Sequence, residues 1–266
     1  MLQLPTKEIA YLVGGPELCT RPLPPYHPLV CKFLDRLSTE LRSSTLPDIA
    51  AFAFWCRKGN IDRLRANALN TDQRLGVGLS LHITPSNVPV NFAFSFAFGL
   101  LSGNANIVRV PSKHFPQVDI ICEAIQRILQ KKEFSEMKSM NALVRYDSNT
   151  EVTAQLSVLA NARIIWGGDE TVQQIKKLRA PVRSADLVFA DRYSFSVIDG
   201  QTILELNESD LKRLADAFYN DTYLLDQNAC SSPHLIVWLG DSKSDAKEKF
   251  WNAVHRATQK KYPLEP

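Results

Sequence analysis

The chain has 266 residues, which is enough to bury a sizeable core in one large domain or two smaller ones. Its 45% apolar and 22% charged residues are typical of an ordinary soluble globular protein. The formal net charge is only +3 and the basic residues are dispersed, which excludes an extended nucleic-acid-binding surface.

The first 74 residues are expected to form a helical region. A proline-rich segment (21–29) predicts an extended loop, and helices are expected at 29–42 and 47–57. In the first of these helices, apolar side chains recur at helical spacing, as at Leu34, Leu37 and Leu41.

From residue 75 onward, strands and helices alternate regularly. This order favours an α/β fold with a parallel, doubly wound sheet. Such sheets bind nucleotides beyond the carboxyl ends of their strands, so residues 75–200 are interpreted as a nucleotide-binding domain. The expected strands are 75–83, 106–110, 142–146, 162–166, 186–190 and 194–198, and the expected helices are 88–101, 115–132, 151–159 and 170–178.

The rhythm changes after Gly200. A helix is expected after Asn207, its candidate N-cap, with Leu211, Leu214 and Phe218 buried on one face. A strand (235–239) and a helix from Ser244 follow. A single βα unit can add to the first sheet, or it can open a second domain that continues beyond this chain.

The five cysteines form no CxxC pair, and neither they nor the five histidines have metal-ligand spacing. An odd count without a disulfide pattern favours a reducing compartment. The N-terminus lacks the pattern of a signal peptide, and the most apolar stretch (88–101) is shorter than the roughly 20 residues that span a bilayer. We therefore expect a cytoplasmic protein with no metal site and no membrane span.

Cys230 lies in DQNACSSPHLIVWLG (226–240), between the helix and the strand that follow Gly200. This position predicts a turn, where a thiolate can meet a substrate. Cysteine becomes a nucleophile when its thiolate is favoured, and the neighbouring Ser231, Ser232 and Asn228 offer polar groups. The alternative is a buried structural thiol, which is the interpretation for Cys19, Cys31, Cys56 and Cys122.

Two segments carry a family resemblance: QNACSSP around Cys230, and PSNVPVNFAFSFAFGLLSGN (85–104). Both resemble the LuxC-type long-chain fatty acyl-CoA reductases, a branch of the aldehyde dehydrogenase superfamily. The resemblance extends from about residue 70 to the end. It implies an aldehyde dehydrogenase-like fold with an N-terminal helical region (1–74), a nucleotide-binding domain (75–200) and the first part of a catalytic domain (201–266). Since family members continue well past this point, the chain is expected to be truncated.

The resemblance also implies catalytic roles. Cys230 would carry the acyl group, and Asn87 aligns with the superfamily's oxyanion-hole asparagine. An amide donor and the Cys230 backbone N–H can stabilise the oxyanion that forms when a thiolate attacks a thioester. Without the resemblance, Asn87 would be interpreted as a simple Asx turn between Pro85 and Pro89.

For the cofactor, NIVRVPSK (106–113) resembles the superfamily strand whose lysine contacts the adenosine ribose, with one extra residue in the spacing. Arg109 or Lys113 would supply the cation, which favours a 2′-phosphate and hence NADPH. Alternatively, Arg109 is a solvent-facing strand residue. In IIWGGDETVQQIKK (164–177), Gly167 and Gly168 would let the backbone approach the pyrophosphate at a helix N-terminus, although the later glycine of the superfamily's GSTxxG turn is absent.

Phe189 stands where oxidative aldehyde dehydrogenases carry the glutamate that activates water. Its presence argues that a thioester is made or consumed rather than hydrolysed. The resemblance therefore implies NADPH-dependent reduction of a long-chain acyl-CoA or acyl-protein thioester to an aldehyde, with an acyl-protein synthetase as partner and a homo-oligomer when full length. An oxidative aldehyde dehydrogenase and an inactive nucleotide- or partner-binding fragment remain as alternatives. His82 and His234 flank the key motifs, and each is interpreted as a core or turn residue. For His234, tuning of the Cys230 pKa is the alternative.

Overall fold

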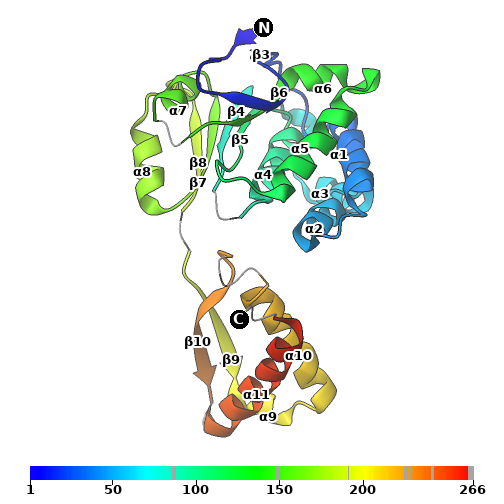
Figure 1. Cartoon of the computed structure of the whole chain (residues 1–266), viewed down its shortest axis with the longest axis vertical. Coiled ribbons are helices and arrows are strands. Elements are labelled where there is room, and N and C mark those ends of the chain that lie inside the picture. The colour runs from blue at the N-terminus through cyan, green and yellow to red at the C-terminus, as the bar shows by residue number, and fades with distance from the viewer. Residues whose placement is uncertain are drawn as a thin grey trace. The chain divides into compact units, whose positions relative to one another are not determined.

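The computed structural model of the chain describes residues 1–85, 88–147, 150–190, 192–224, 227, 229–240 and 243–262. These residues form two compact units, Met1–Ala190 (unit 1) and Asp191–Pro266 (unit 2). Each unit has its own cluster of buried apolar side chains, and each is described separately here (Figure 1).

Unit 1 is built around a six-stranded sheet with the order β2-β6-β5-β4-β7-β8. Five strands are parallel, and β2 pairs antiparallel with β6 at one edge. The prediction of a parallel α/β sheet is confirmed. The strands are β2 (Ala10–Val13), β4 (Leu79–Ile83), β5 (Ala105–Arg109), β6 (Asn141–Arg145), β7 (Ala162–Trp166) and β8 (Ala185–Phe189).

Helices cover both faces of this sheet (Figure 1). On one face lie α4 (Asn91–Leu101) and α5 (Pro116–Leu129); on the other lie α7 (Thr150–Ser157) and α8 (Asp169–Lys177). The chain passes from β4 to β5 and β6 through right-handed crossovers, which place α4 and α5 on one face. It then returns to β7 on the other side of β4 and continues to β8, which places α7 and α8 on the opposite face. Because both faces are covered, all five residues of β4 are buried, as expected for a central parallel strand.

The N-terminal residues complete the same core rather than a separate one. α1 (Pro28–Leu41) packs against α4 and α5, with the Phe33 ring edge-on to Phe96 and to Phe134 at 6.4 and 5.8 Å between centroids. Proline at the start of α1 presets the helical φ angle. The remaining elements of unit 1 are β1 (Leu2–Gln3), β3 (Glu17–Leu18), α2 (Pro47–Trp55), α3 (Lys58–Asn67), η1 (Thr71–Gln73), η2 (Lys132–Phe134) and α6 (Ser135–Met140).

Unit 2 contains a two-stranded parallel sheet, β9 (Ser194–Asp199) with β10 (Pro233–Leu239). One face is covered by α9 (Gly200–Glu205), α10 (Glu208–Thr222) and α11 (Lys243–Lys261). The predicted N-cap is confirmed: the Asn207 side chain accepts a hydrogen bond from the Asp210 backbone N–H at 2.9 Å. Leu211 and Phe218 are buried as predicted, whereas Leu214 is 36% exposed.

The two units divide the chain differently from the predicted boundaries at 74/75 and 200/201. Residues 1–74 contribute buried side chains to the core of the sheet, so they belong to unit 1. β9 was expected at the end of the nucleotide-binding domain, but it pairs with β10 and belongs to unit 2. Local periodicity predicted β9 and β10 but carried no information about which strand each would join.

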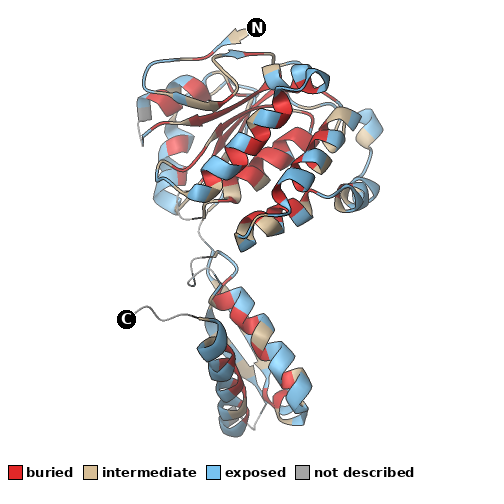
Figure 2. Cartoon of the chain, turned by 45° about the vertical axis from the view of Figure 1, so that its right-hand side comes forward, coloured by how far each residue is buried: buried red, intermediate tan, exposed pale blue. Residues whose placement is uncertain are grey.

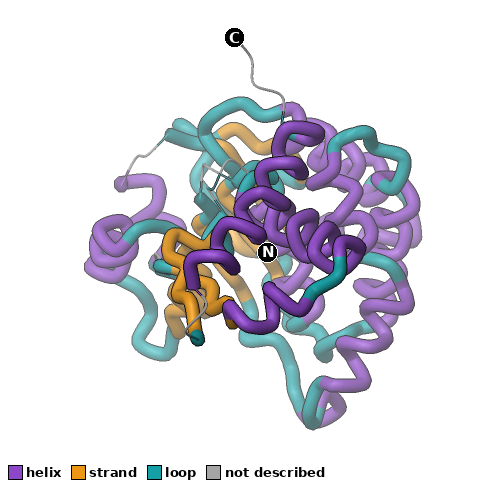
Figure 3. The backbone as a smooth tube through the Cα atoms, turned by 90° about the horizontal axis from the view of Figure 1, so that it is seen from below, coloured by secondary structure: helices purple, strands orange, loops and turns teal. Residues whose placement is uncertain are grey.

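The second face of the β9–β10 sheet is exposed. The central strands of the sheet in unit 1, by contrast, are buried and are red in Figure 2. Side chains alternate along β9 and β10, so every second residue lies on the exposed face. Figure 3 shows the strands of the chain in orange and the helices in purple. The exposed apolar residues of this face are Phe195, Val197, Leu235, Val237 and Leu239.

Candidate functional site

The carboxyl edge of the sheet in unit 1 brings several predicted site residues together. Strands are added to the sheet on one side of β4 as far as β6 and then on its other side from β7, and in open α/β sheets ligands bind at such a switch point. Ile83 pairs in register with Arg109 on one side and Ile165 on the other. Arg109 and the Gly167–Gly168 turn therefore flank the end of β4. Asn87, predicted to be the oxyanion donor, lies outside the described residues.

Arg109 ends β5 and is half-buried against Tyr146 rather than extended into solvent. Its guanidinium carbon lies 4.9 Å from the centre of the Tyr146 ring, and one terminal nitrogen reaches the Tyr146 carbonyl at only 3.5 Å. The Arg109 Nε is buried without a hydrogen-bond partner in the structure. A buried, unused donor on a permanent cation has spare capacity for an anionic ligand.

Lys113 has a different setting. It is exposed, and its ammonium lies 5.3 Å from the centre of the Phe115 ring, in the loop between β5 and α5. The loop that follows β4 is tied to β5 through Thr84, whose hydroxyl donates to the Arg109 carbonyl at 2.6 Å. Of the two candidate cations, Arg109 is thus the one held at the end of a strand.

The glycine turn has a backbone suited to a phosphate but an opposing local charge. Gly168 caps α8 without any side-chain hydrogen bond, so the first N–H groups of the helix stay open. A Cβ on Gly167 would lie 3.2 Å from the Thr171 methyl group. Asp169 and Glu170, however, occupy the first turn, where their carboxylates interact with the positive end of the helix dipole and repel phosphate.

A chain of buried hydrogen bonds crosses the sheet beneath this edge. Trp166 Nε1–H donates to Ser95 Oγ at 3.2 Å, Ser95 Oγ lies 2.8 Å from His82 Nδ1, and His82 Nε2 lies 3.0 Å from Asn106 Oδ1. Asn106 Nδ2 donates to the Asn104 carbonyl and to Asn141 Oδ1, both at 2.9 Å. We call the Trp166–Ser95–His82–Asn106 series the His82 chain.

The His82 chain has a fixed direction. Asn106 Oδ1 must accept, because its amide nitrogen already donates to two oxygens. His82 therefore carries its proton on Nε2, and Nδ1 accepts from the Ser95 hydroxyl. Burial lowers the pKa of His82 to about 4, so the ring is neutral at physiological pH. The interpretation of His82 as a satisfied core residue is confirmed.

Trp166 and Phe189 form an aromatic pair that the sequence analysis missed. They are register partners at the carboxyl ends of β7 and β8, and their rings stack at 3.9 Å with an 8° angle between planes. Phe189 is the residue expected in place of the glutamate base. An aromatic residue directly before the Gly167–Gly168 turn was the one signal in the sequence that pointed to this pair.

Cys230 lies in unit 2, on the turn between α10 and β10 as predicted, and its side chain is exposed. The turn is anchored at both sides. The Ser194 hydroxyl donates to the Cys230 carbonyl at 2.6 Å, and the Ser232 hydroxyl donates to the Asp221 carbonyl at 2.8 Å. The serines thus hold the backbone and leave the thiol accessible.

The other four cysteines are partly or fully buried, so Cys230 is the exposed thiol among the five, all of which lie in the described ranges. Burial raises the pKa of Cys122 to about 12 and raises that of Cys56 and Cys31. These groups are poor nucleophiles at neutral pH, because the thiolate is the reactive form. His234 is exposed, and its ring centre lies 5.5 Å from that of Tyr193.

Neither a cluster of metal-ligating side chains nor a membrane-spanning helix is found among the described residues. Within the described ranges, no group of three or more His, Cys, Asp or Glu side chains could hold a metal ion. In the same ranges, no helix has the length and apolar content needed to cross a bilayer.

Comparison with known proteins identifies the family. The family described as "Acyl-CoA reductase (LuxC)" matches residues 20–266. Among curated proteins, the chain is 26% identical to long-chain acyl-protein thioester reductase 2 of Photobacterium leiognathi over 62% of the chain and 33% of that protein. It is also 26% identical to the long-chain acyl-protein thioester reductase of Vibrio harveyi over 65% of the chain and 34% of that protein. The chain thus matches about a third of the length of these relatives.

Solved structures show the same fold at low identity. A lactaldehyde dehydrogenase structure matches 88% of the chain and 52% of its own length, with a TM-score of 0.62 and 14% identity. An oxidoreductase from Marinobacter aquaeolei matches 91% of the chain and 54% of its own length, with a TM-score of 0.63 and 13% identity. These likenesses establish an aldehyde dehydrogenase-like fold, as the sequence predicted.

Proposed function

Because the chain belongs to the acyl-CoA reductase (LuxC) family, we propose that it takes part in reducing a long-chain acyl thioester to an aldehyde through an acyl-enzyme on Cys230. The observation that carries this proposal is the exposed thiol on an anchored turn, inside the matched residues. The substrate would be acyl-CoA or an acylated protein, in keeping with the names of the relatives.

The chemistry begins with acyl transfer. The Cys230 thiolate attacks the thioester carbonyl carbon, a new C–S bond forms, and the thiol of the donor leaves as a thiolate. The oxyanion formed on the way would be stabilised by the Cys230 backbone N–H and by Asn87. After reduction of the thioacyl group, the C–S bond to Cys230 breaks and releases the aldehyde.

A nicotinamide cofactor, when bound, supplies the hydride for this reduction. We propose NADPH, held by Arg109 or Lys113 near its 2′-phosphate and by the Gly167–Gly168 backbone near its pyrophosphate. The buried, unpartnered Arg109 Nε supports an anion at this edge. The acidic first turn of α8 makes the glycine turn the weaker of the two contacts.

We further propose a cytoplasmic enzyme that forms a homo-oligomer in its full-length form and receives acyl groups from an acyl-protein synthetase. Reduction is favoured over oxidation of an aldehyde to an acid because Phe189, stacked on Trp166, leaves no carboxylate at the position expected for a water-activating base. A chain that only binds nucleotide or a partner is the remaining alternative, and the experiment below separates it.

Intact-mass analysis after incubation with palmitoyl-CoA tests the proposal. We expect one acyl group to be added to the wild-type chain, none to Cys230→Ala, and an unchanged amount to Cys122→Ala. Labelling that persists in Cys230→Ala would remove the nucleophile assignment. A wild-type chain that never acylates but binds NADPH would favour the nucleotide-binding alternative.

The cofactor preference has its own test. Dissociation constants for NADPH and NADH are measured on the wild type, Arg109→Ala and Lys113→Ala. We expect NADPH to bind more tightly than NADH, and at least one variant to lose this preference. Tighter binding of NADH by the wild type, or an unchanged ratio in both variants, would contradict the proposal.

A further inference from the structure

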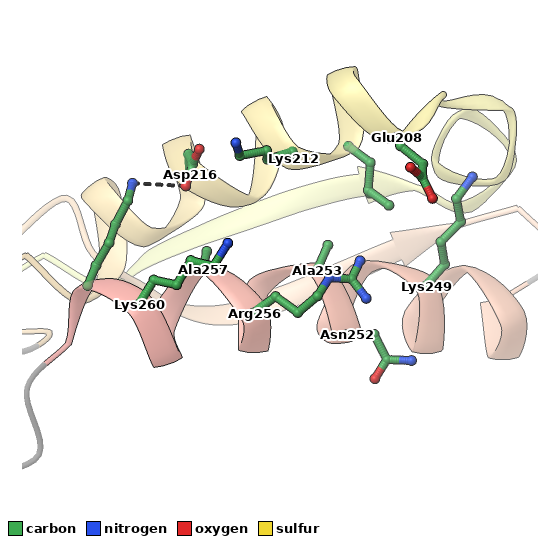
Figure 4. Close-up of a pocket in the computed structure, with 11 residues that line it drawn as sticks. Glu208, Lys212, Asp216, Lys249, Asn252, Ala253, Arg256, Ala257 and Lys260 are labelled. Atoms are coloured by element: carbon green, nitrogen blue, oxygen red, sulfur yellow. Dashed lines mark ion pairs between the residues drawn. The ribbon is translucent and has the colours of Figure 1, made fainter.

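A groove of about 670 Å³ runs between α10 and α11 in unit 2 (Figure 4). Its floor is apolar and buried, with Leu211 from α10 and the small side chains of Ala253 and Ala257 from α11. The small residues leave room between the helices, while long side chains form the rim. The charged residues of the rim are Lys212, Lys249, Arg256, Lys260 and Lys261, with Glu208 and Asp216.

Two of the five cations of this groove have partners within the fold. Lys249 Nζ donates to the Leu204 and Leu206 carbonyls, both at 2.8 Å. Lys261 Nζ pairs with Asp216 at 2.9 Å, and this contact holds the pKa of Asp216 below its usual value. Lys249 therefore joins α11 to the end of α9, and Lys261 joins α11 to α10.

The other three cations are exposed and form no ion pair among the described residues: Lys212, Arg256 and Lys260. The helix dipole explains a cation in the last turn of α11, such as Lys260. It does not explain Lys212 on α10 or Arg256 in the preceding turn of α11. The charges of Lys212 and Lys260 help to lower the pKa of Asp216, but no ion pair among the described residues engages the three side chains, so they remain available above the apolar floor.

We propose that this groove binds an acidic helical segment of a partner protein. The three unpaired cations are divided between two helices: Lys212 lies on α10, whereas Arg256 and Lys260 lie one helical turn, about 6 Å, apart on α11. A phosphate group would instead need several donors directed at one point. An amphipathic helix fits the observed layout, because its aliphatic side chains can contact the floor while its carboxylates meet the rim. The surface does not include Cys230, so the inference goes beyond the proposed reaction.

The test uses a fluorescein-labelled peptide of about 16 residues, with glutamates one helical turn apart on one face and leucines beside them. Binding to the 266-residue chain is measured by fluorescence anisotropy. The groove variant is Lys212→Gln/Arg256→Gln/Lys260→Gln. The control is Lys176→Gln/Lys177→Gln/Arg179→Gln, which also removes two lysines and one arginine, but from exposed positions of unit 1.

We expect the groove variant to weaken peptide binding by about tenfold or more, and the control to stay within about twofold, because screened surface charges act at short range. Equal losses in both variants would overturn the proposal, since net charge would explain them. Binding of free CoA or of phosphatidylglycerol vesicles at the groove, without binding of the peptide, would also overturn it.

Circular dichroism checks that both triple variants keep the wild-type helix content, and the single variant Arg256→Gln serves if the groove variant does not fold. Its expected loss is about threefold. Acylation of Cys230 by palmitoyl-CoA is measured in parallel and should be unchanged in the groove variant. Failure of peptide binding with normal acylation would refute the docking surface alone, and failure of acylation with normal peptide binding would refute the proposed reaction alone.

Discussion

The parallel strands of the two units have the same backbone pattern but different surroundings. β4 in unit 1 is buried over its whole length, whereas β9 and β10 in unit 2 alternate between a covered face and an exposed apolar face. Parallel sheets are normally covered on both faces. Unit 1 therefore covers the central strands of its sheet on both faces, while unit 2 carries the exposed Cys230 thiol on a smaller core. We expect unit 2 to be the less stable of the two.

The variant with the largest expected effect on this difference in stability is Phe250→Ala. Phe250 is fully buried and contacts the rings of Phe218, Trp238 and Trp251 in the small core of unit 2. Removing a buried Phe costs about 4 kcal/mol, which is comparable to the whole stability of a small unit. Hydrogen exchange should show unprotected amides in α10 and α11 while β4 and β5 keep their protection.

The matched control for this variant is Phe195→Ala, the same change on the exposed face of the sheet, where the side chain is 60% exposed. It should leave exchange in α10 and α11 nearly unchanged. If both variants unfold unit 2, the exposed face carries more stability than its solvent exposure suggests. If neither does, unit 2 is more stable than its core size predicts.

In unit 1, Gly99→Ala should damage the His82 chain. A Cβ at this position would lie 2.8 Å from His82 Nε2 and even closer to Asn106 Oδ1, so α4 could not keep its distance from the sheet. We expect a loss of about 3 kcal/mol in the free energy of unfolding, because overpacking and a broken buried hydrogen bond act together. Urea titration followed by circular dichroism measures it.

Gly59→Ala is the control, because a Cβ there meets no atom within 4 Å. Gly59 lies in α3, so alanine should be neutral or stabilising by up to about 1 kcal/mol. Equal stability of the two alanine variants would show that α4 can move away from the sheet without cost.

The buried imidazole predicts a pH effect confined to unit 1. His82 has a pKa of about 4 in the folded chain and about 6.5 when unfolded, so below pH 6.5 the unfolded chain binds a proton that the folded chain does not. The contribution of neutral His82 to the free energy of unfolding should be at its full value above pH 6.5, and it should decrease by about 3 kcal/mol as the pH falls to 4. Exchange protection of β4 and β5 between these pH values measures it.

His82→Gln should be less pH-dependent than the wild type over the same range, because glutamine can accept from Ser95 and donate to Asn106 without titrating. An identical pH dependence in the two proteins would mean that other groups control acid unfolding. The comparison removes the contribution of carboxylates that both proteins share.

The smallest expected effect is on the exposed face of unit 2. Val197→Thr keeps the shape and β-propensity of a side chain that is 53% exposed, so stability should change by less than about 0.5 kcal/mol. Solubility at high concentration, measured by light scattering, should improve because an apolar patch becomes smaller. A clear loss of stability would indicate that Val197 is covered in solution.

Much of the fold could be predicted because its signals are local. Alternating strands and helices predicted the parallel strands of both units, and Asn207 was predicted as an N-cap from its position before an apolar-periodic segment. β2 was missed because its four residues pair with β6, far away along the chain. α3 was missed because Ile61 is its one buried residue, so it has no apolar periodicity.

The candidate site also has some features that local sequence predicts and others that depend on residues far apart in the chain. The turn at Cys230 and the glycine turn follow from the helices and strands beside them, so their placement could be read locally. The His82 chain could not, because Ser95 and Trp166 are 71 residues apart and meet only through the crossovers of the sheet. The unpartnered Nε of Arg109 likewise depends on Tyr146, 37 residues later.

The hydrogen bond from Ser194 to the Cys230 carbonyl links the proposed nucleophile to the first residue of β9, 36 positions earlier. Sliding β9 by one residue against β10 would displace that carbonyl by about 3.3 Å, more than a reacting pair of atoms tolerates. Ser194→Ala should therefore change the rate at which iodoacetamide alkylates Cys230, while Ser231→Ala should not. Mechanical tension on the segment that enters β9 would then shift Ser194 and, through this hydrogen bond, the backbone of Cys230, and so change the reactivity of the thiol.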